Sequence, residues 1–280
     1  MKATQLSPTA SLANASPILP VYLICDTSSS MNTFTDITPA QSDINEDNQP
    51  RQRRIDVLND ALCDLIVAVA TAPRTIYRAN LSVISFGSTA RTNLPLSPVN
   101  SALTIKPLVA GGTTSYSAAL SEFENRLNID AQQRGSRRDF RPVAFFLTDG
   151  QPTEHTSRWS PICERLSRRS HPSLPPRILP CPIGEAKPGV LDRLTTSYST
   201  DVKGFTGQIL TDGHDVATAI HSIFGRIART LNPAFDESDF PPTVKVSFEE
   251  QVAYMDTVVA RAVASNESTT NFRDYLGGYR

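Results

Sequence analysis

The sequence predicts an α/β domain with a mainly parallel central sheet, one antiparallel edge strand and helices on both faces. Two patterns lead to this fold class. Residues 21–25 and 143–147 are short, continuous apolar runs, as expected for strands that are buried on both faces. Residues 55–72 and 215–231 carry apolar side chains at helical spacing. Strand-like and helix-like segments that alternate along a chain favour a parallel sheet covered by helices.

The other elements follow from the same periodicities. Residues 81–86 are predicted to form the second strand, and a turn at Gly87-Ser88 returns the chain into a short edge strand at 89–94. The turn at Gly111-Gly112 opens a helix at 116–127. Further strands are expected at 178–182 and 208–210, and further helices at 161–169 and 190–198.

Composition is that of an ordinary globular protein. The 280 residues carry a net charge of -1, with 39% hydrophobic and 20% charged residues. This balance gives no general attraction to nucleic acid or to an anionic membrane. The 4 cysteines form no C-x-x-C pair, so neither a zinc ribbon nor a redox pair is indicated. We expect reduced thiols, with a Cys163–Cys181 disulfide as the open alternative.

The chain divides into segments of different character. Residues 1–16 are rich in Ser, Thr, Ala and Asn and predict a flexible tail. Residues 17–232 hold the α/β pattern, interrupted at 32–52 by a polar loop insert without clear periodicity. Residues 233–280 form a C-terminal extension. The apolar run at 18–25 is too short for a membrane span and lacks signal-peptide flanks, so a cytoplasmic protein is expected.

Polar side chains gather where the predicted strands end. Asp26, Ser28 and Ser30 share one tight turn after the first buried strand. Residues 148–150, Thr-Asp-Gly, follow the strand at 143–147, and a Gly-Gly-Thr-Thr-Ser loop precedes the helix at 116–127. In a doubly wound sheet, ligands bind outside the carboxyl ends of the strands. We therefore expect all three loops to open onto the same edge of the sheet.

These loops offer two carboxylates and several hydroxyls, without histidine or thiolate. Such a set of hard oxygens suits Mg²⁺ or Mn²⁺ and is poor for zinc or copper. Magnesium usually keeps some water ligands, which leaves room for a ligand from outside. An acidic side chain of a partner protein can take that place.

The three motifs resemble the metal-ion-dependent adhesion site (MIDAS) of von Willebrand factor A (vWA) domains. They are Asp-x-Ser-x-Ser at 26–30, the Gly-Gly-Thr loop, and the apolar strand that ends in Thr-Asp-Gly. The resemblance covers about residues 17–231 and implies a Rossmann-like vWA fold that binds another protein through a cation. The stretches LPVYLICDTSSSM, LSVISFGSTAR and RPVAFFLTDGQPTE look most like TerY-type proteins of bacterial tellurium-resistance and stress gene clusters.

The resemblance also implies which residues hold the ion. Asp26, Ser28 and Ser30 match the first motif, and Asp149 matches the late aspartate. Two threonines compete for the remaining place: adjacency to the glycines favours Thr113, whereas the spacing to residues 118–120 favours Thr114. We take Thr114. The implied site is a Mg²⁺ or Mn²⁺ ion held directly or through water by Asp26, Ser28, Ser30, Thr114 and Asp149.

Two departures from the family pattern stand out. Ser29 occupies a position where the family often has glycine, and we interpret it as a spacer in the turn. The insert at 32–52 is longer than in compact members and carries acidic side chains. Either one of these carboxylates fills the open metal position and blocks the partner, or the insert is a solvated polar loop. The acidic residues are Asp36, Asp43, Glu46 and Asp47.

The rival function is a metal-dependent hydrolase or phosphoryl-transfer enzyme that uses Asp26. Such chemistry needs a positioned base or nucleophile and a cation for the transferring phosphate. The sequence has neither a G-x-x-x-x-G-K-[ST] phosphate loop nor a G-x-S-x-G elbow. We therefore predict a protein-binding module without enzymatic activity.

Overall fold

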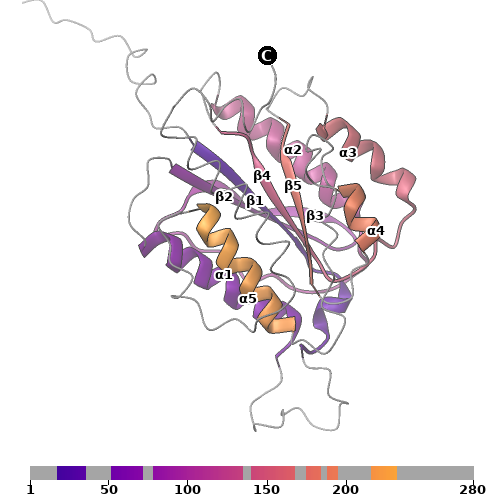
Figure 1. The fold of residues 1–280 in the computed structure, drawn as a ribbon, viewed down its shortest axis with the longest axis horizontal. Helices are drawn as coiled ribbons and strands as arrows, with labels where there is room; N and C mark the ends of the chain where they lie inside the picture. Colours follow the sequence, from indigo (N-terminus) through magenta and orange to yellow (C-terminus); the bar gives the residue numbers. More distant parts are fainter. Residues whose placement is uncertain are drawn as a thin grey trace, which may run out of the picture.

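The structure, a computed structural model, contains a five-stranded sheet between two layers of helices (Figure 1). It describes residues 18–35, 52–71, 78–134, 140–167, 175–183, 188–194 and 216–231. The strands are β1 (Ile18–Asp26), β2 (Arg78–Phe86), β3 (Ala90–Pro98), β4 (Val143–Thr148) and β5 (Arg177–Pro182). The helices are α1 (Arg54–Thr71), α2 (Tyr116–Arg134), α3 (Ser160–Ser167), α4 (Pro188–Leu191) and α5 (Val216–Leu231), with 3-10 turns η2 (Ser29–Asn32), η3 (Thr156–Arg158) and η4 (Asp192–Leu194).

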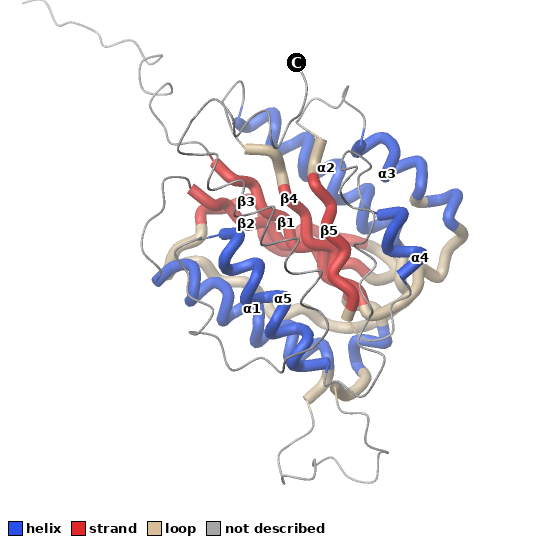
Figure 2. Tube along the Cα trace, in the orientation of Figure 1, coloured by secondary structure: helices blue, strands red, loops and turns tan. Residues whose placement is uncertain are grey.

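The sheet order is β3-β2-β1-β4-β5 (Figure 2). β1 lies in the middle and runs parallel to both β2 and β4, β4 runs parallel to β5, and β3 pairs antiparallel with β2 at the edge. The predicted fold class, with its single antiparallel edge strand, is therefore confirmed. The strand expected at 208–210, the tail at 1–16 and the extension at 233–280 lie outside the described residues.

Several elements differ in length from their predictions. β1 begins at Ile18 and every residue of it is buried, so the strand extends through Pro20. α2 continues to Arg134, because buried Asp130 keeps its last turns attached to the core. Where a helix was expected at 190–198, the described residues form the short α4 followed by η4, and residues 195–198 lie outside the described residues.

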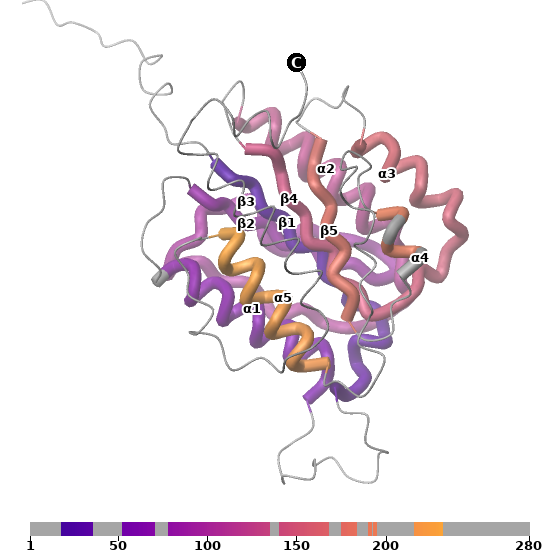
Figure 3. The backbone as a smooth tube through the Cα atoms, viewed as in Figure 1, coloured from indigo at the N-terminus to yellow at the C-terminus, as the bar shows by residue number. Residues whose placement is uncertain are grey.

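Alternate residues of the central strand serve two separate cores. Val21, Leu23 and Cys25 pack in the core on the side of α1 and α5, whereas Tyr22 and Ile24 pack in the core on the side of α2, α3 and α4. The two helical layers lie on opposite sides of the sheet (Figure 3). This alternation follows from the two-residue period of a strand. A strand that is buried on both sides in this way needs a continuous apolar run, which explains the pattern seen in the sequence.

The chain order places a switch point at the middle of the sheet. From β1 the chain passes through α1 to β2, and it later returns through α2 to β4 on the other side of β1. The two connections lie on opposite faces (Figure 1). The loop after β1 leads to α1 on one face and the loop after β4 leads to α3 on the other, so both loops begin at the switch point, where open α/β sheets bind ligands.

The cysteines and the helices add two further findings. Cys25, Cys63, Cys163 and Cys181 are all free, and the open Cys163–Cys181 alternative is not formed. Burial raises the pKa of the Cys163 and Cys181 thiols to about 12, so both stay protonated near neutral pH.

Among the described residues, no helix combines the length and apolar character that crossing a bilayer requires.

A buried polar cluster ties α2 to β1. The Tyr22 hydroxyl donates to Asp130 Oδ2 at 2.9 Å, and the Arg126 guanidinium pairs with Asp130 Oδ1. We expect Asp130→Ala to lower the free energy of unfolding by about 2 kcal/mol, because it leaves a buried hydroxyl without an acceptor. Urea unfolding measures the loss. Tyr22→Phe, which removes the donor and leaves the Arg126 pair, should cost less; an equal cost in both variants would contradict the explanation.

Candidate metal site

Two buried carboxylates lie at the carboxyl ends of adjacent strands. Asp26 is the last residue of β1, and Asp149 directly follows Thr148, the last residue of β4. Asp26 is 0% exposed and Asp149 is 2% exposed. Burial of two carboxylates at the switch point of the sheet is expensive unless positive charge or donors compensate it.

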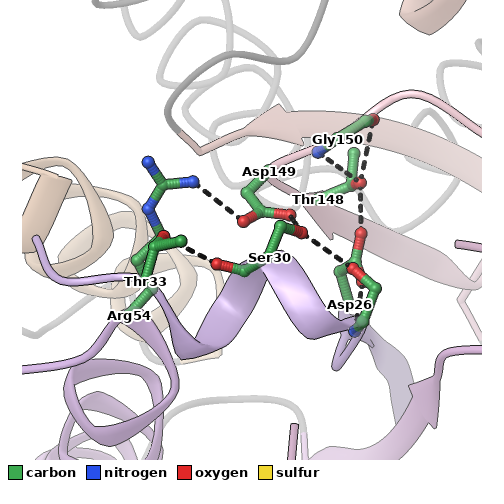
Figure 4. Close-up of polar contacts among 8 residues, drawn as sticks. Asp26, Ser30, Thr33, Arg54, Thr148, Asp149 and Gly150 are labelled. Atoms are coloured by element: carbon green, nitrogen blue, oxygen red, sulfur yellow. Dashed lines mark hydrogen bonds and ion pairs between the residues drawn. The ribbon is translucent and has the colours of Figure 1, made fainter. Parts of the chain in front are cut away.

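Asp26 is held from two sides. The backbone amide of Ser28 donates to Oδ1 at 2.8 Å. The Thr148 hydroxyl donates to Oδ2 at 2.6 Å (Figure 4). Burial raises the pKa of Asp26 to about 6, and the hydrogen bonds from Ser28 and Thr148 lower it only in part. Asp26 is therefore a carboxylate that its surroundings only partly satisfy.

Hydroxyl groups bridge the first motif to Asp149. The Ser28 and Ser30 hydroxyl oxygens are 3.0 Å apart, and the Ser30 hydroxyl donates to Asp149 Oδ1 at 2.7 Å (Figure 4). Ser28 and Ser30 lie on either side of the start of η2, which turns the chain so that both side chains stand near the end of β4. Four of the five residues predicted as ligands are thus connected by these bonds and the Asp26–Ser28 contact.

Of the two threonines that compete for the fifth ligand place, Thr114 lies beside Gly150, whereas Thr113 contacts Ser88. Thr114 is 6% exposed, and its Oγ1 lies 3.7 Å from the place where a Cβ on Gly150 would stand. Ser30 Oγ lies 3.9 Å from that same point, so these two hydroxyls flank Gly150. Thr113 is exposed, and its Oγ1 and backbone amide contact the Ser88 hydroxyl instead.

Hydrogen bonds from two backbone amides and from the Ser29 hydroxyl connect the glycine loop to the first motif. The Gly111 amide donates to the Thr27 carbonyl at 2.7 Å, and both the amide and the hydroxyl of Ser29 donate to the Gly112 carbonyl. Ser29 is therefore more than a spacer, because its side chain helps to hold this loop. Gly112 has φ 81°, and a Cβ there would stand 2.5 Å from Ser88 Oγ, so only glycine fits.

Aromatic side chains of the core pack beside the loop that follows β4. The Tyr116 hydroxyl donates to the Gly150 carbonyl at 3.0 Å, and burial raises the pKa of Tyr116. The Tyr116 ring packs edge to face against Phe86, Phe146 and Trp159, with centroids 6.1, 5.0 and 5.7 Å away. The loop after β4 is thus fixed by a rigid core rather than by loop contacts alone.

Arg54 is a site residue that the sequence patterns missed. Its Nη1 donates to Asp149 Oδ2 at 2.9 Å, in an ion pair whose arginine side chain is 12% exposed (Figure 4). The predicted helix began one residue later, and Arg54 looked like part of the polar insert. The available signal was its place as the first residue of α1, where the helix dipole disfavours a positive charge.

The insert is closed at its base. Phe34 and Arg53 form an isolated antiparallel bridge, and the Thr35 amide donates to the Gln52 carbonyl at 3.0 Å. We call this pairing of residues 34–35 with 52–53 the neck. Residues 36–51, with Asp36, Asp43, Glu46 and Asp47, lie outside the described residues, so both readings of the insert stay predictions.

The donor set fits a small, hard cation. In the described part of the chain, no three His, Cys, Asp or Glu side chains come together as a metal site. A cation here would depend on hydroxyls beside the two carboxylates, which is the chemistry of Mg²⁺ or Mn²⁺ sites rather than of zinc. The burial of both carboxylates at the ends of adjacent strands, with Asp26 0% and Asp149 2% exposed, is the observation that a bound cation would explain.

Comparisons with known proteins gave structural likenesses only. No family model and no curated protein matches the sequence. Similar solved structures are a von Willebrand factor type A protein from Catenulispora acidiphila (15% identity, TM-score 0.48, 78% of this chain and 43% of that one) and the PilB minor pilin from Streptococcus sanguinis (13%, 0.47, 81% and 64%). A third is proximal thread matrix protein 1 from the mussel byssus with a zinc-occupied MIDAS motif (15%, 0.44, 80% and 48%). This chain thus spans less than half the length of the first and the third.

Proposed function

We propose that this protein is a non-enzymatic, divalent-cation-dependent protein-binding module. Its site would hold Mg²⁺ or Mn²⁺ through Asp26, Ser28, Ser30, Thr114 and Asp149. The supporting observation is the convergence of two buried carboxylates and three hydroxyls from three separate loops at the switch point of the sheet. Hydrogen bonds to Asp26 and Asp149 come from hydroxyls, a backbone amide and an arginine, which are positioning groups rather than general bases.

Each residue has a part in this proposal. Asp26 and Asp149 supply the negative charge, and the hydroxyls of Ser28, Ser30 and Thr114 supply neutral oxygens. Thr148 and the Ser28 amide orient the Asp26 carboxylate, as partners behind metal ligands commonly do. When bound, the cation would offer a coordination position to an Asp or Glu side chain of a partner protein.

The finer setting follows from the sequence resemblance. TerY-type similarity in the strand-flanking stretches supports a role in a bacterial tellurium-resistance or stress-response system, in the cytoplasm. In that setting Mg²⁺ would be the resident ion. The proposal needs no contact with nucleic acid or membrane, in keeping with a net charge of -1.

Calorimetric titration with Mg²⁺ and Mn²⁺ tests the site. We expect the wild type to bind and its melting temperature to rise, because a cation present at a hundred times its Kd adds about 2.7 kcal/mol of stability. Asp26→Ala should show neither effect. If the wild type binds neither ion, the proposed function fails.

The two threonines provide a matched pair for the same titration. Thr114→Val should weaken cation binding by about tenfold, because it removes an oxygen and keeps the volume. Thr113→Val should leave the affinity unchanged, because its hydroxyl contacts Ser88. The reverse result would move the ligand to Thr113.

Retention of a partner in Mg²⁺ and its release by EDTA test whether binding depends on the cation. Proteins retained by the immobilised wild type in Mg²⁺, released by EDTA and not retained by Asp26→Ala are candidate partners. For a purified candidate, an Asp→Asn or Glu→Gln change at one position should abolish the cation-dependent binding. A partner that binds equally well in EDTA would contradict the proposed mode.

A further inference from the structure

We propose that Arg54 is a built-in counter-cation of the metal site, which stabilises Asp149 in the absence of a divalent ion and lowers the affinity of the site for that ion. This inference rests on the proposed function and deepens it by naming the residue that sets the cation affinity. It starts from the ion pair between Arg54 Nη1 and Asp149 Oδ2 at 2.9 Å.

Arg54 belongs to a closed ring of hydrogen bonds. The Ser30 hydroxyl donates to Asp149 Oδ1, and Arg54 donates to Oδ2 of the same carboxylate (Figure 4). On the backbone side, the Arg54 amide donates to the Thr33 carbonyl at 3.0 Å, and the amide and hydroxyl of Thr33 donate to the Ser30 carbonyl. The ring returns to Ser30, so the turn that carries two of the predicted ligands also positions Arg54.

The position of Arg54 within α1 does not by itself favour an arginine. It is the first residue of α1, where the partial positive charge of the helix end repels a cation. The one acidic residue in the first turn is Asp56. Asp149 is therefore the group that makes this position favourable for arginine.

The ion pair is built so that it can be exchanged. A guanidinium and a carboxylate that form a permanent pair commonly meet through two parallel hydrogen bonds. Here one hydrogen bond is made, through Nη1, and the buried Nε of Arg54 has no partner among the described residues. Because this pair leaves a buried donor unsatisfied, less free energy is lost when the pair breaks and Asp149 binds another cation.

Charge determines the direction of the effect. Asp26 and Asp149 together carry two negative charges when ionised, and Arg54 compensates one of them. The guanidinium would repel a divalent ion held by these carboxylates and would compete with it for Asp149. Removal of the guanidinium should therefore tighten cation binding by about tenfold or more, because the interaction lies in a mostly buried environment of low dielectric.

The experiment compares cation affinity and cation-free stability in two arginine variants. Arg54→Met keeps an unbranched apolar stem and removes the guanidinium with its charge. We expect Mn²⁺ and Mg²⁺ to bind at least about tenfold tighter in calorimetry, and the melting temperature in EDTA to fall. Arg126→Met is the matched control, because Arg126 is also 12% exposed and pairs with a buried aspartate, Asp130. It should lose stability without any change in cation affinity. If Arg54→Met does not fold, Arg54→Gln gives the same readout.

The outcomes separate this inference from the proposed function. Wild-type binding with unchanged or weaker affinity in Arg54→Met overturns the inference and leaves the metal site standing. Binding in Arg54→Met but not in the wild type supports the effect of the guanidinium, which then excludes the ion, while the proposed function of the unaltered protein fails. If neither protein binds a cation, both fail.

Discussion

Asp26→Asn is expected to stabilise the cation-free protein and to abolish its response to Mg²⁺. The wild-type carboxylate is buried, and burial raises its pKa to about 6, so its ionised form destabilises the fold near neutral pH. An asparagine can still accept from the Ser28 amide and can donate to the Thr148 hydroxyl. Thr148 can then donate to the Gly150 carbonyl, 3.3 Å away. The gain should be roughly 2–3 kcal/mol at most in EDTA.

The pH dependence of stability tests whether the ionised Asp26 carboxylate is the destabilising form. A carboxyl group whose pKa is higher in the folded than in the unfolded state binds its proton more tightly when folded. The wild type should therefore lose stability relative to Asp26→Asn as the pH rises from about 4 to about 6, and the difference should level off above that. Melting temperatures in EDTA across this range measure it. A difference that does not change with pH would contradict the explanation.

Asp149→Asn is the control at the same site. Asp149 is similarly buried but has the Arg54 guanidinium as a partner, so its neutralisation leaves a mostly buried arginine without a counter-charge. We expect this variant to be less stable than the wild type without cation. Stabilisation by both substitutions would mean that mutual repulsion of the carboxylates, rather than burial of Asp26, is the dominant cost.

Trp159→Ala is expected to give the largest loss of stability, about 3–5 kcal/mol. Trp159 is fully buried between η3 and α3 and packs edge to face on Tyr116, with ring centroids 5.7 Å apart. The cavity left by the indole would also free the Tyr116 ring, whose hydroxyl holds the Gly150 carbonyl. Cation affinity should therefore fall together with stability. Urea unfolding and calorimetry measure the two effects.

Trp159→Phe separates packing from polarity. The indole Nε1 is buried without a hydrogen-bond partner among the described residues, so the phenyl ring removes an unsatisfied donor along with some volume. We expect this variant to lose about 1 kcal/mol and to keep its cation affinity. If Trp159→Phe loses as much as Trp159→Ala, an interaction of Nε1 matters more than the packing does.

The sequence was most informative where burial was complete. β1 and β4 are continuous apolar runs because both of their faces meet helices, and such runs have few other interpretations. The polar residues that end these strands could be assigned to one edge because parallel strands share their direction. Periodicity could not fix the ends of α2, since its last turns depend on Asp130 and its partners on β1 and α2.

Arg54 shows what sequence patterns leave out. Its role comes from a contact with Asp149, 95 residues away, and no local rule links the two positions. The choice between Thr113 and Thr114 had the same difficulty, because the direction of each side chain is set by Ser88 and by the positive φ of Gly112. The order of the motifs predicts which loops meet, whereas backbone conformation determines which atoms face each other.

The neck gives the insert a direct mechanical connection to the site. Arg53 closes the neck through its bridge to Phe34, and Arg54, the next residue, holds Asp149. A force on the segment between the two sides of the neck would thus reach the site through a single peptide bond. A reporter attached between the two sides of the neck would therefore be joined covalently to Arg54 without a label on the predicted metal ligands.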